Sequence, residues 1–358
     1  MPSRSSSGLG ETHLRNWTPV YVDLEGGPQA VTWLNLNQTA FTDPFFADTV
    51  DRHRRLHPRA ETKTTPLATL AAVGEAITSL PLTGFILHMS RCGSTLLANM
   101  LRSLPRNLVI GEAQPVSELL YGAACGLLGM QGTRLLRTVV RVLGQPRHGA
   151  ERHYFVKFTS WSTLYVSYLT RIFDRVPWLF LVRVPVDVMI SNLQRPGAWM
   201  QAQSNSGEAA ELAGVDFEAV SIMSAEEYCA RILGRFCKAA ADAAPMHRLV
   251  LDYSELTADR LPEVLAFFGV STTSEEALGM TAALLYEAKD ATGTRPFRPR
   301  AVDRYKASTQ VIELAERWIY EPYTRLLRDR EVILALPTRG GPPRGRPPQT
   351  RGRPGKST

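Results

Sequence analysis

The sequence has few cysteines and no long apolar run. Its 358 residues include four cysteines, and none has the Cys-x-x-Cys spacing of a metal site. Four are too few for a disulfide framework in a chain of this length, so we expect a reducing compartment. No run of about 18 uncharged apolar residues occurs, and residues 1–17 hold no apolar segment that could act as a signal peptide. These absences predict a soluble cytoplasmic protein that makes no membrane contact.

Positive charge is concentrated near the C-terminus. The formal net charge is +7, and residues 337–358 carry six basic residues and no acidic one: Arg339, Arg344, Arg346, Arg351, Arg353 and Lys356. The rest of the chain is therefore almost neutral, which does not favour a nucleic-acid surface on the folded part. Nucleic-acid binding stays open only for this basic tail.

The most informative stretch is residues 85–101, FILHMSRCGSTLLANML. Its apolar pattern predicts a short strand, a tight turn, and a helix beginning at Ser94. Such a turn directs unpaired N–H groups and the positive end of the helix dipole at one point, where an anion binds. Gly93 permits close backbone approach, the hydroxyl of Thr95 adds a donor, and Arg91 adds a charged fork of donors. The stretch predicts an anion site.

Strands alternate with helices through most of the chain, which predicts an α/β fold with a parallel sheet flanked by helices. Four charged residues follow four different predicted strands: Arg91, Glu112, Lys157 and Arg183. Ligands of such sheets bind beyond the carboxyl ends of the strands. We therefore expect these four side chains to converge.

Prolines, glycines and changes of composition along the sequence predict four segments. These are a disordered N-terminus (1–15), an N-terminal extension packing on the core (16–80), the α/β domain (81–335) and a disordered tail rich in Pro, Gly and Arg (336–358). Within the extension, Asp43 is expected to cap a helix. Within the α/β domain, the polar and weakly periodic residues 195–220 predict a mobile loop or lid.

The anion site does not have the pattern of an ordinary ATP- or GTP-binding loop, G-x-x-x-x-G-K-[ST]. With Gly93 as the second glycine, His88 stands at the first glycine position and Ser94 at the lysine position. The end of the motif recurs at residues 355–358, but Thr350 stands where glycine is required. The sequence therefore disfavours a common nucleotide phosphotransferase.

Two motifs resemble those of the sulfotransferases that use 3'-phosphoadenylyl sulfate (PAPS). SRCGST, residues 90–95, is similar to the loop that holds the 5'-phosphosulfate, with Arg91 at its basic position. RVPVDVMIS, from Arg183 to Ser191, is similar to the motif that holds the 3'-phosphate. The resemblance implies PAPS as the sulfuryl donor, and no metal is expected.

A third motif resembles a later strand and turn of the same family. It is LVLDYSEL, residues 249–256, in which the tyrosine near the adenine is Tyr253. The resemblance covers about residues 85–270 and implies a P-loop NTPase-like sulfotransferase architecture. The donor-binding residues that it implies are Arg91, Cys92, Gly93, Ser94, Thr95, Arg183, Ser191, Tyr253 and Lys306, the last from a loop where the family often closes basic residues over the cofactor.

The resemblance also implies a division of catalytic roles. Thr159 stands where many small-molecule sulfotransferases have a catalytic histidine, and Val184 replaces the usual acidic residue after Arg183. The segment of Glu112 is similar to that of the glutamate base in the tyrosylprotein branch, so Glu112 is the expected base, a role worth roughly 10²- to 10⁴-fold in rate. Lys157 and Arg91 would neutralise charge on the leaving phosphate oxygen.

The leading hypothesis is in-line transfer of a sulfuryl group to a hydroxyl or amine of a small-molecule, peptide or glycan acceptor. The alternatives are an atypical P-loop kinase or nucleotide phosphotransferase, and a non-enzymatic nucleotide-binding scaffold with a basic tail. Single residues also have structural alternatives: a helix N-cap or first-turn carboxylate for Glu112, a solvated strand end for Lys157, core packing for Tyr253, and a small filler or a reactive thiol for Cys92. The sequence does not indicate an oligomeric state.

Overall fold

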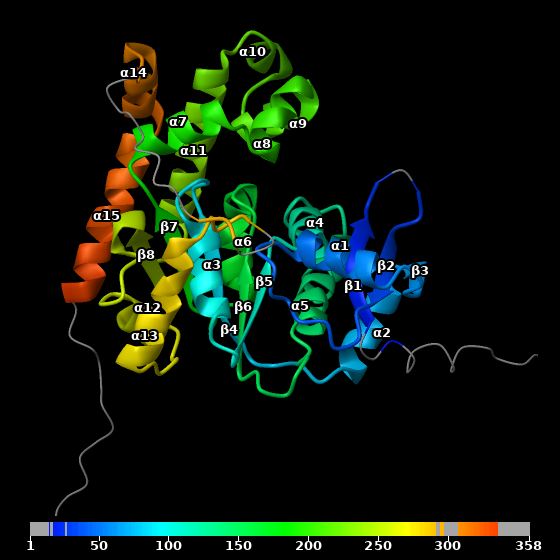
Figure 1. The fold of residues 1–358 in the computed structure, drawn as a ribbon. Coiled ribbons are helices and arrows are strands. Elements are labelled where there is room, and N and C mark those ends of the chain that lie inside the picture. The colour runs from blue at the N-terminus through cyan, green and yellow to red at the C-terminus, as the bar shows by residue number, and fades with distance from the viewer. Residues whose placement is uncertain (1–13, 15–16, 26, 291–293, 297–306, 336–358) are drawn as a thin grey trace, which may run out of the picture.

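The computed structural model describes residues 14, 17–25, 27–290, 294–296 and 307–335. They form two sheets of different kinds with helices between and around them (Figure 1). Lys306 and the two predicted terminal segments, apart from Leu14, lie outside the described residues.

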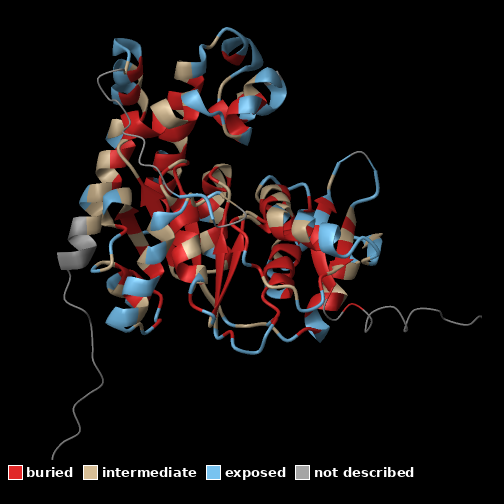
Figure 2. Cartoon of the chain, in the orientation of Figure 1, coloured by how far each residue is buried: buried red, intermediate tan, exposed pale blue. Residues whose placement is uncertain are grey.

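The central sheet is parallel and has five strands in the order β5-β6-β4-β7-β8, which confirms the predicted α/β class. Its strands are β4 (Leu82–His88), β5 (Asn107–Gly111), β6 (His153–Lys157), β7 (Trp178–Val182) and β8 (Arg248–Asp252). Every residue of β7 is buried, because helices cover both faces of the sheet (Figure 2). This explains the continuous apolar run in its sequence.

Ten α-helices accompany this sheet in the described part of the α/β region, besides three short α-helices described below and several 3-10 turns. They are α3 (Ser94–Arg102), α4 (Gln114–Ala124), α5 (Gly132–Leu143), α6 (Val166–Ile172), α7 (Pro185–Gln194), α11 (Ala225–Asp242), α12 (Leu261–Phe267), α13 (Ser274–Met280), α14 (Thr309–Trp318) and α15 (Tyr320–Ala335). A one-residue interruption at Ile319 separates α14 from α15. Within the described ranges, none of the helices combines the length and the apolarity that crossing a membrane requires.

The N-terminal region forms an antiparallel sheet of β1 (Trp17–Asp23), β2 (Ala30–Asn35) and β3 (Thr62–Pro66), with α1 (Phe46–Leu56) and α2 (Thr69–Ala76). It lies beside α4 and α5 (Figure 1). Two hydrogen bonds fix β1 to α4: Val22 N–H donates to Gln114 Oε1 over 2.9 Å, and Gln114 Nε2 donates to Val22 O over 2.8 Å. The amide of Gln114 thus continues the backbone bonding of an edge strand.

The prediction that Asp43 caps a helix is wrong. Phe45 is the residue before α1, and it has extended backbone angles. The carboxylate of Asp43 instead accepts from Thr49 Oγ1 over 2.7 Å and from Arg52 Nε over 2.9 Å. Because α1 begins three residues after Asp43, this side chain bonds to Thr49 and Arg52 rather than to the first N–H groups of the helix.

The prediction of a loop at residues 195–220 is also wrong. The segment folds into three short helices, α8 (Ala198–Gln201), α9 (Ser206–Ala213) and α10 (Phe217–Ser221), which lie above α4 and α6 (Figure 1). They bury Trp199, whose carbonyl accepts from the hydroxyl of Tyr228 over 3.0 Å. Helices of four to eight residues are too short for an apolar period to show in the sequence.

Candidate active site

The predicted anion loop lies where the sheet changes its direction of winding. β4 and β7 are neighbours, but the chain leaves β4 toward β5 on one side and leaves β7 toward β8 on the other. Ligands of open α/β sheets bind in the crevice at such a switch point. The Arg91 loop follows β4 and Arg183 follows β7, so both predicted phosphate motifs border this place.

The anion loop has a strained backbone. Ser90, Arg91 and Gly93 have φ values of 78°, 45° and 91°, in the left-handed region that favours glycine. Among the described residues only five non-glycine positions have positive φ, and Glu112 joins Ser90 and Arg91 in that group. A non-glycine residue in such a conformation costs about 1–3 kcal/mol, and such residues cluster at functional sites.

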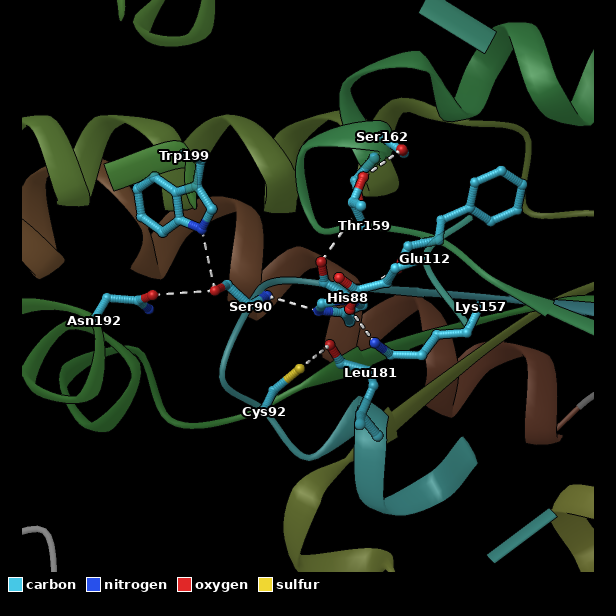
Figure 3. Close-up of polar contacts among 12 residues, drawn as sticks. His88, Ser90, Cys92, Glu112, Lys157, Thr159, Ser162, Leu181, Asn192 and Trp199 are labelled. Atoms are coloured by element: carbon cyan, nitrogen blue, oxygen red, sulfur yellow. Dashed lines mark hydrogen bonds and ion pairs between the residues drawn. The ribbon is translucent and has the colours of Figure 1, made fainter. Parts of the chain in front are cut away.

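Three hydrogen bonds hold the loop in this conformation (Figure 3). The hydroxyl of Ser90 donates to Asn192 Oδ1 over 3.1 Å and accepts from Trp199 Nε1 over 3.2 Å. The thiol of Cys92 donates to Leu181 O over 3.1 Å. The loop is therefore fixed by α7, α8 and β7 before any ligand binds.

The thiol of Cys92 is a structural group. The residue is fully buried, and burial raises its pKa to about 12. A thiol in this state is not a nucleophile, so the reactive alternative is wrong and the small-filler interpretation is confirmed. Cys92 can meet a ligand only through its backbone.

Tyr253 joins the two predicted phosphate motifs. Its ring lies so close to Gly93 that a Cβ atom there would be 2.5 Å from Cδ2 of the ring. The guanidinium carbon of Arg183 lies 4.9 Å from the centroid of the same ring. Tyr253 is only partly buried, so it is more than a core residue: it forms a wall shared by both motifs.

Arg183 has a carboxylate partner that the sequence did not reveal. Its Nη2 lies 3.5 Å from Oδ2 of Asp187, four residues later on α7, and 23% of its side chain stays exposed. Ser191 is one further turn along and shares this helix face. The i, i+4 spacing of Asp187 from Arg183 could have identified this acid, since Val184 occupies the expected acidic position.

Glu112 and Lys157 form an ion pair at the ends of β5 and β6. Lys157 Nζ bonds to Glu112 Oε1, and the N–H of Glu112 donates to Lys157 O over 2.7 Å (Figure 3). The lysine side chain has no exposed surface, whereas 26% of the glutamate side chain is exposed. Glu112 precedes α4 and its N-cap Ala113, so it is neither a helix cap nor a first-turn carboxylate. Lys157 is buried, so it is not a solvated strand end.

His88 supports this pair as a neutral imidazole. Its Nδ1 accepts from the N–H of Ser90 over 3.1 Å, and its Nε2 lies 3.1 Å from Phe158 O, which can only accept. Burial, with the charges of Lys157 and Lys289, lowers the pKa of His88 well below its usual range. The proton therefore sits on Nε2, which also lies 3.9 Å from Glu112 Oε1. The sequence feature that points to this role is a histidine at the end of an apolar strand.

Arg91 and Thr159 both bond to other parts of the chain. The guanidinium of Arg91 donates to the carbonyl of Arg195 at the end of α7. Burial, together with the charge of Arg195, lowers the pKa of Arg91. Thr159, at the position expected for a histidine, bonds to Ser162 Oγ over 2.7 Å (Figure 3).

Ser94 and Thr95 begin α3, and both are buried beneath the loop. The first N–H groups of a helix lack partners within the helix, so this end of α3 presents donors to the crevice. In the described part of the chain, no group of three or more His, Cys, Asp or Glu side chains is placed to hold a metal ion.

No family model matches the sequence, and a comparison with curated proteins finds no match. Among solved structures, the sulfotransferase domain from the curacin biosynthetic pathway is similar with a TM-score of 0.36 and 15% identity, over 67% of this chain and 98% of that one. Retinol dehydratase in complex with androsterone and inactive cofactor PAP gives a TM-score of 0.35 and 16% identity, over 73% and 88%. Its complex with retinol and PAP gives 0.33 and 17%, over 74% and 88%. TM-scores this low do not decide an activity.

Proposed function

We propose that the chain is a sulfotransferase that moves a sulfuryl group from PAPS to a hydroxyl or amine acceptor. One observation supports this most: the ring of Tyr253 lies against both Gly93 of the loop after β4 and Arg183 after β7. Two anion-binding places that share an aromatic wall suit a nucleotide with a phosphate group at each end of its ribose. ATP has no phosphate for the second place.

The residues of the site fit such a donor. The left-handed turn and the N-terminal end of α3 would hold the 5'-phosphosulfate, and Arg183 with Ser191 would hold the 3'-phosphate. Arg183 keeps part of its surface exposed although Asp187 already faces it, so it can take a second anionic partner. The partly exposed ring of Tyr253 offers a face on which an adenine could stack.

Glu112 is proposed as the general base. As the acceptor oxygen forms its bond to sulfur, its proton passes to the carboxylate, and the sulfur–oxygen bond to the 5'-phosphate breaks with its electron pair left on the phosphate. The products are the sulfated acceptor and 3',5'-adenosine bisphosphate (PAP). Lys157 and His88 both face Oε1 of Glu112, which leaves Oε2 as the oxygen available to an acceptor.

The cell compartment of the protein is also proposed, from the state of its cysteines. All four cysteines carry free thiols, as is usual for proteins of a reducing compartment, and we propose a cytoplasmic location on this ground. The acceptor is proposed only by class, as a small molecule, peptide or glycan that presents a hydroxyl or amine.

The experiment that tests the donor is thermal unfolding of the full chain with PAP, and separately with ATP plus magnesium. PAP is expected to raise the midpoint of unfolding, because it binds the folded state alone. Stabilisation by ATP with magnesium and none by PAP would overturn the proposal in favour of a phosphotransferase.

A further inference from the structure

An aromatic ring from the N-terminal region lies beside the ion pair of Glu112 and Lys157, which we call the catalytic pair. Phe45, just before α1, has Lys157 Nζ 5.2 Å from its ring centroid and Lys289 Nζ 5.8 Å from it. The residue before it, Pro44, places its carbonyl where a Cβ atom on Gly111 would lie 2.8 Å away. The N-terminal region is therefore fitted against the end of β5, next to Glu112.

Lys289 reaches the same place from the other end of the chain. Its segment is fixed to α3 by a hydrogen bond of 2.9 Å from Asn99 Nδ2 to the carbonyl of Ala288. Its ammonium interacts electrostatically with Arg91, Glu112 and Lys157. Lys289 thus interacts both with the anion loop and with the pair of Glu112 and Lys157.

The charges of this centre do not cancel. Arg91, Lys157 and Lys289 are cations, Glu112 is one carboxylate, and His88 is neutral. One carboxylate does not balance three cations, and like charges held together are costly unless further negative charge lies among them. The surplus of positive charge therefore points to a negatively charged group bound between the loop and Glu112.

Two of the cations differ in what they can contact. Lys157 has no exposed surface and its ammonium bonds to Glu112, so its charge neutralises that carboxylate. Lys289 is exposed as a residue, although burial around its ammonium and the charges of Arg91 and Lys157 lower its pKa, so its side chain lies at the edge of the site where a ligand can meet it. This difference favours Lys289 over Lys157 as the cation that a ligand meets.

On the premise of the proposed function, we propose that Lys289 is the cation that faces the sulfuryl group during transfer, and that Phe45 positions it. As sulfur exchanges the phosphate oxygen for the acceptor oxygen, its three other oxygens keep their negative charge, and the ammonium of Lys289 stabilises them. Lys289 neither gains nor loses a proton. Phe45 acts through Lys289 by a cation–π contact and is a positioning residue.

The test compares the affinities of PAPS and PAP, measured by calorimetry on the full chain, because the two nucleotides differ by the sulfuryl group. Lys289→Met is expected to weaken PAPS about tenfold more than PAP, as expected for loss of a charged hydrogen bond. Lys289→Arg should keep the PAPS affinity. Phe45→Leu should act like Lys289→Met but more weakly, and Phe45→Tyr, which keeps the ring, should restore the affinity.

Lys63→Met is the matched control. Lys63 lies 4.3 Å above the ring of Trp17, a similar contact on the antiparallel sheet, and its loss should change neither affinity. If the wild-type chain binds neither nucleotide, the proposed function falls and this inference falls with it. If the wild type binds both and Lys289→Met weakens them equally or not at all, only the inference about Lys289 is overturned.

Discussion

The ring of Tyr253 lies against the α-carbon of Gly93, on the side where any other residue would carry its side chain. Tyr253 follows β8 at one edge of the sheet, whereas Gly93 follows β4 at its centre. The contact therefore ties the turn after the edge strand to the anion loop. Two constraints act on position 93: a left-handed backbone and the lack of space for a methyl group.

Gly93→Ala is predicted to abolish donor binding. The methyl group would lie 2.5 Å from Tyr253, so the loop or the ring must move, and the positive φ adds strain. We expect a free energy of unfolding lower by about 1–3 kcal/mol and no thermal stabilisation by PAP. Thermal unfolding with and without PAP measures both effects.

Gly126→Ala separates strain from steric conflict. Gly126 also has a positive φ, of 79°, but no atom lies within 4 Å of the position of its missing Cβ. This variant should lose some stability and keep its response to PAP. An unchanged PAP response in Gly93→Ala as well would contradict the role assigned to the Gly93 turn.

Arg183→Ala is predicted to remove the preference for a 3'-phosphate. The guanidinium is held by Asp187 and by the ring of Tyr253, and it is the charged group expected to meet that phosphate. Loss of a charged hydrogen bond should weaken PAP about 10- to 100-fold and leave 5'-AMP nearly unaffected. Titration with both nucleotides measures the ratio.

Arg231→Ala is the control for this substitution. Arg231 lies 4.0 Å from the ring centroid of Trp318 and pairs with Glu227 at four residues' spacing, and 23% of its side chain is exposed, as in Arg183. These two contacts involve no predicted donor residue, so its loss should leave the ratio unchanged. A ratio that stays the same in Arg183→Ala would disprove the 3'-phosphate assignment.

Glu112→Gln is predicted to slow transfer by roughly 10²- to 10⁴-fold while PAP affinity stays close to normal. The amide cannot accept the acceptor's proton. It also leaves the buried ammonium of Lys157 without its carboxylate, which costs stability, about 3–5 kcal/mol when one partner of a buried pair is removed. Formation of PAP from PAPS with a saturating acceptor measures the rate.

The double variant Glu112→Gln with Lys157→Met distinguishes catalysis from stability. Removing both charges should recover much of the lost stability, because no buried ion remains unpaired. Transfer should remain slow, since the base is still missing. Recovery of the full rate together with stability would remove Glu112 as the base.

The sequence sufficed for the sheet and for the convergence at its edge. β7 is continuously apolar and β4 runs into a Gly-Ser-Thr turn, so local pattern alone identified the two strands that border the crevice. Glu112 and Lys157 were expected to converge because parallel strands end at one edge, and the structure brings them into contact. Asp43 and residues 195–220 were misjudged because their conformations depend on tertiary contacts, with Arg52 and with Ser90.

Lys289 and Phe45 were beyond the reach of sequence reasoning for a physical reason. They are 244 positions apart, and neither follows a strand of the parallel sheet or stands in a motif. A cation–π contact leaves no spacing rule in the chain, unlike a helix face or a strand end. Only packing of the N-terminal region against β5 brings Phe45 to the site.

His88 predicts how stability depends on pH. Burial and the charges of Lys157 and Lys289 lower the pKa of His88, although the carboxylate of Glu112 lies nearby. The imidazole therefore stays neutral in the folded chain below pH 6.5. The unfolded chain takes up that proton near pH 6.5, so it binds more protons than the folded chain there. The free energy of unfolding should therefore fall as the pH drops below 6.5, by at most about 1.4 kcal/mol per pH unit from this group.

His88→Gln should reduce this loss on the acid side, because glutamine cannot be protonated and its amide can still donate to Phe158 O. The free energy of unfolding in urea, measured from pH 5 to pH 8, gives the slope for each variant. Equal acid slopes in His88→Gln and the wild type would mean that His88 is protonated in the folded state, and the bond that its Nδ1 accepts from Ser90 N–H could not then be present.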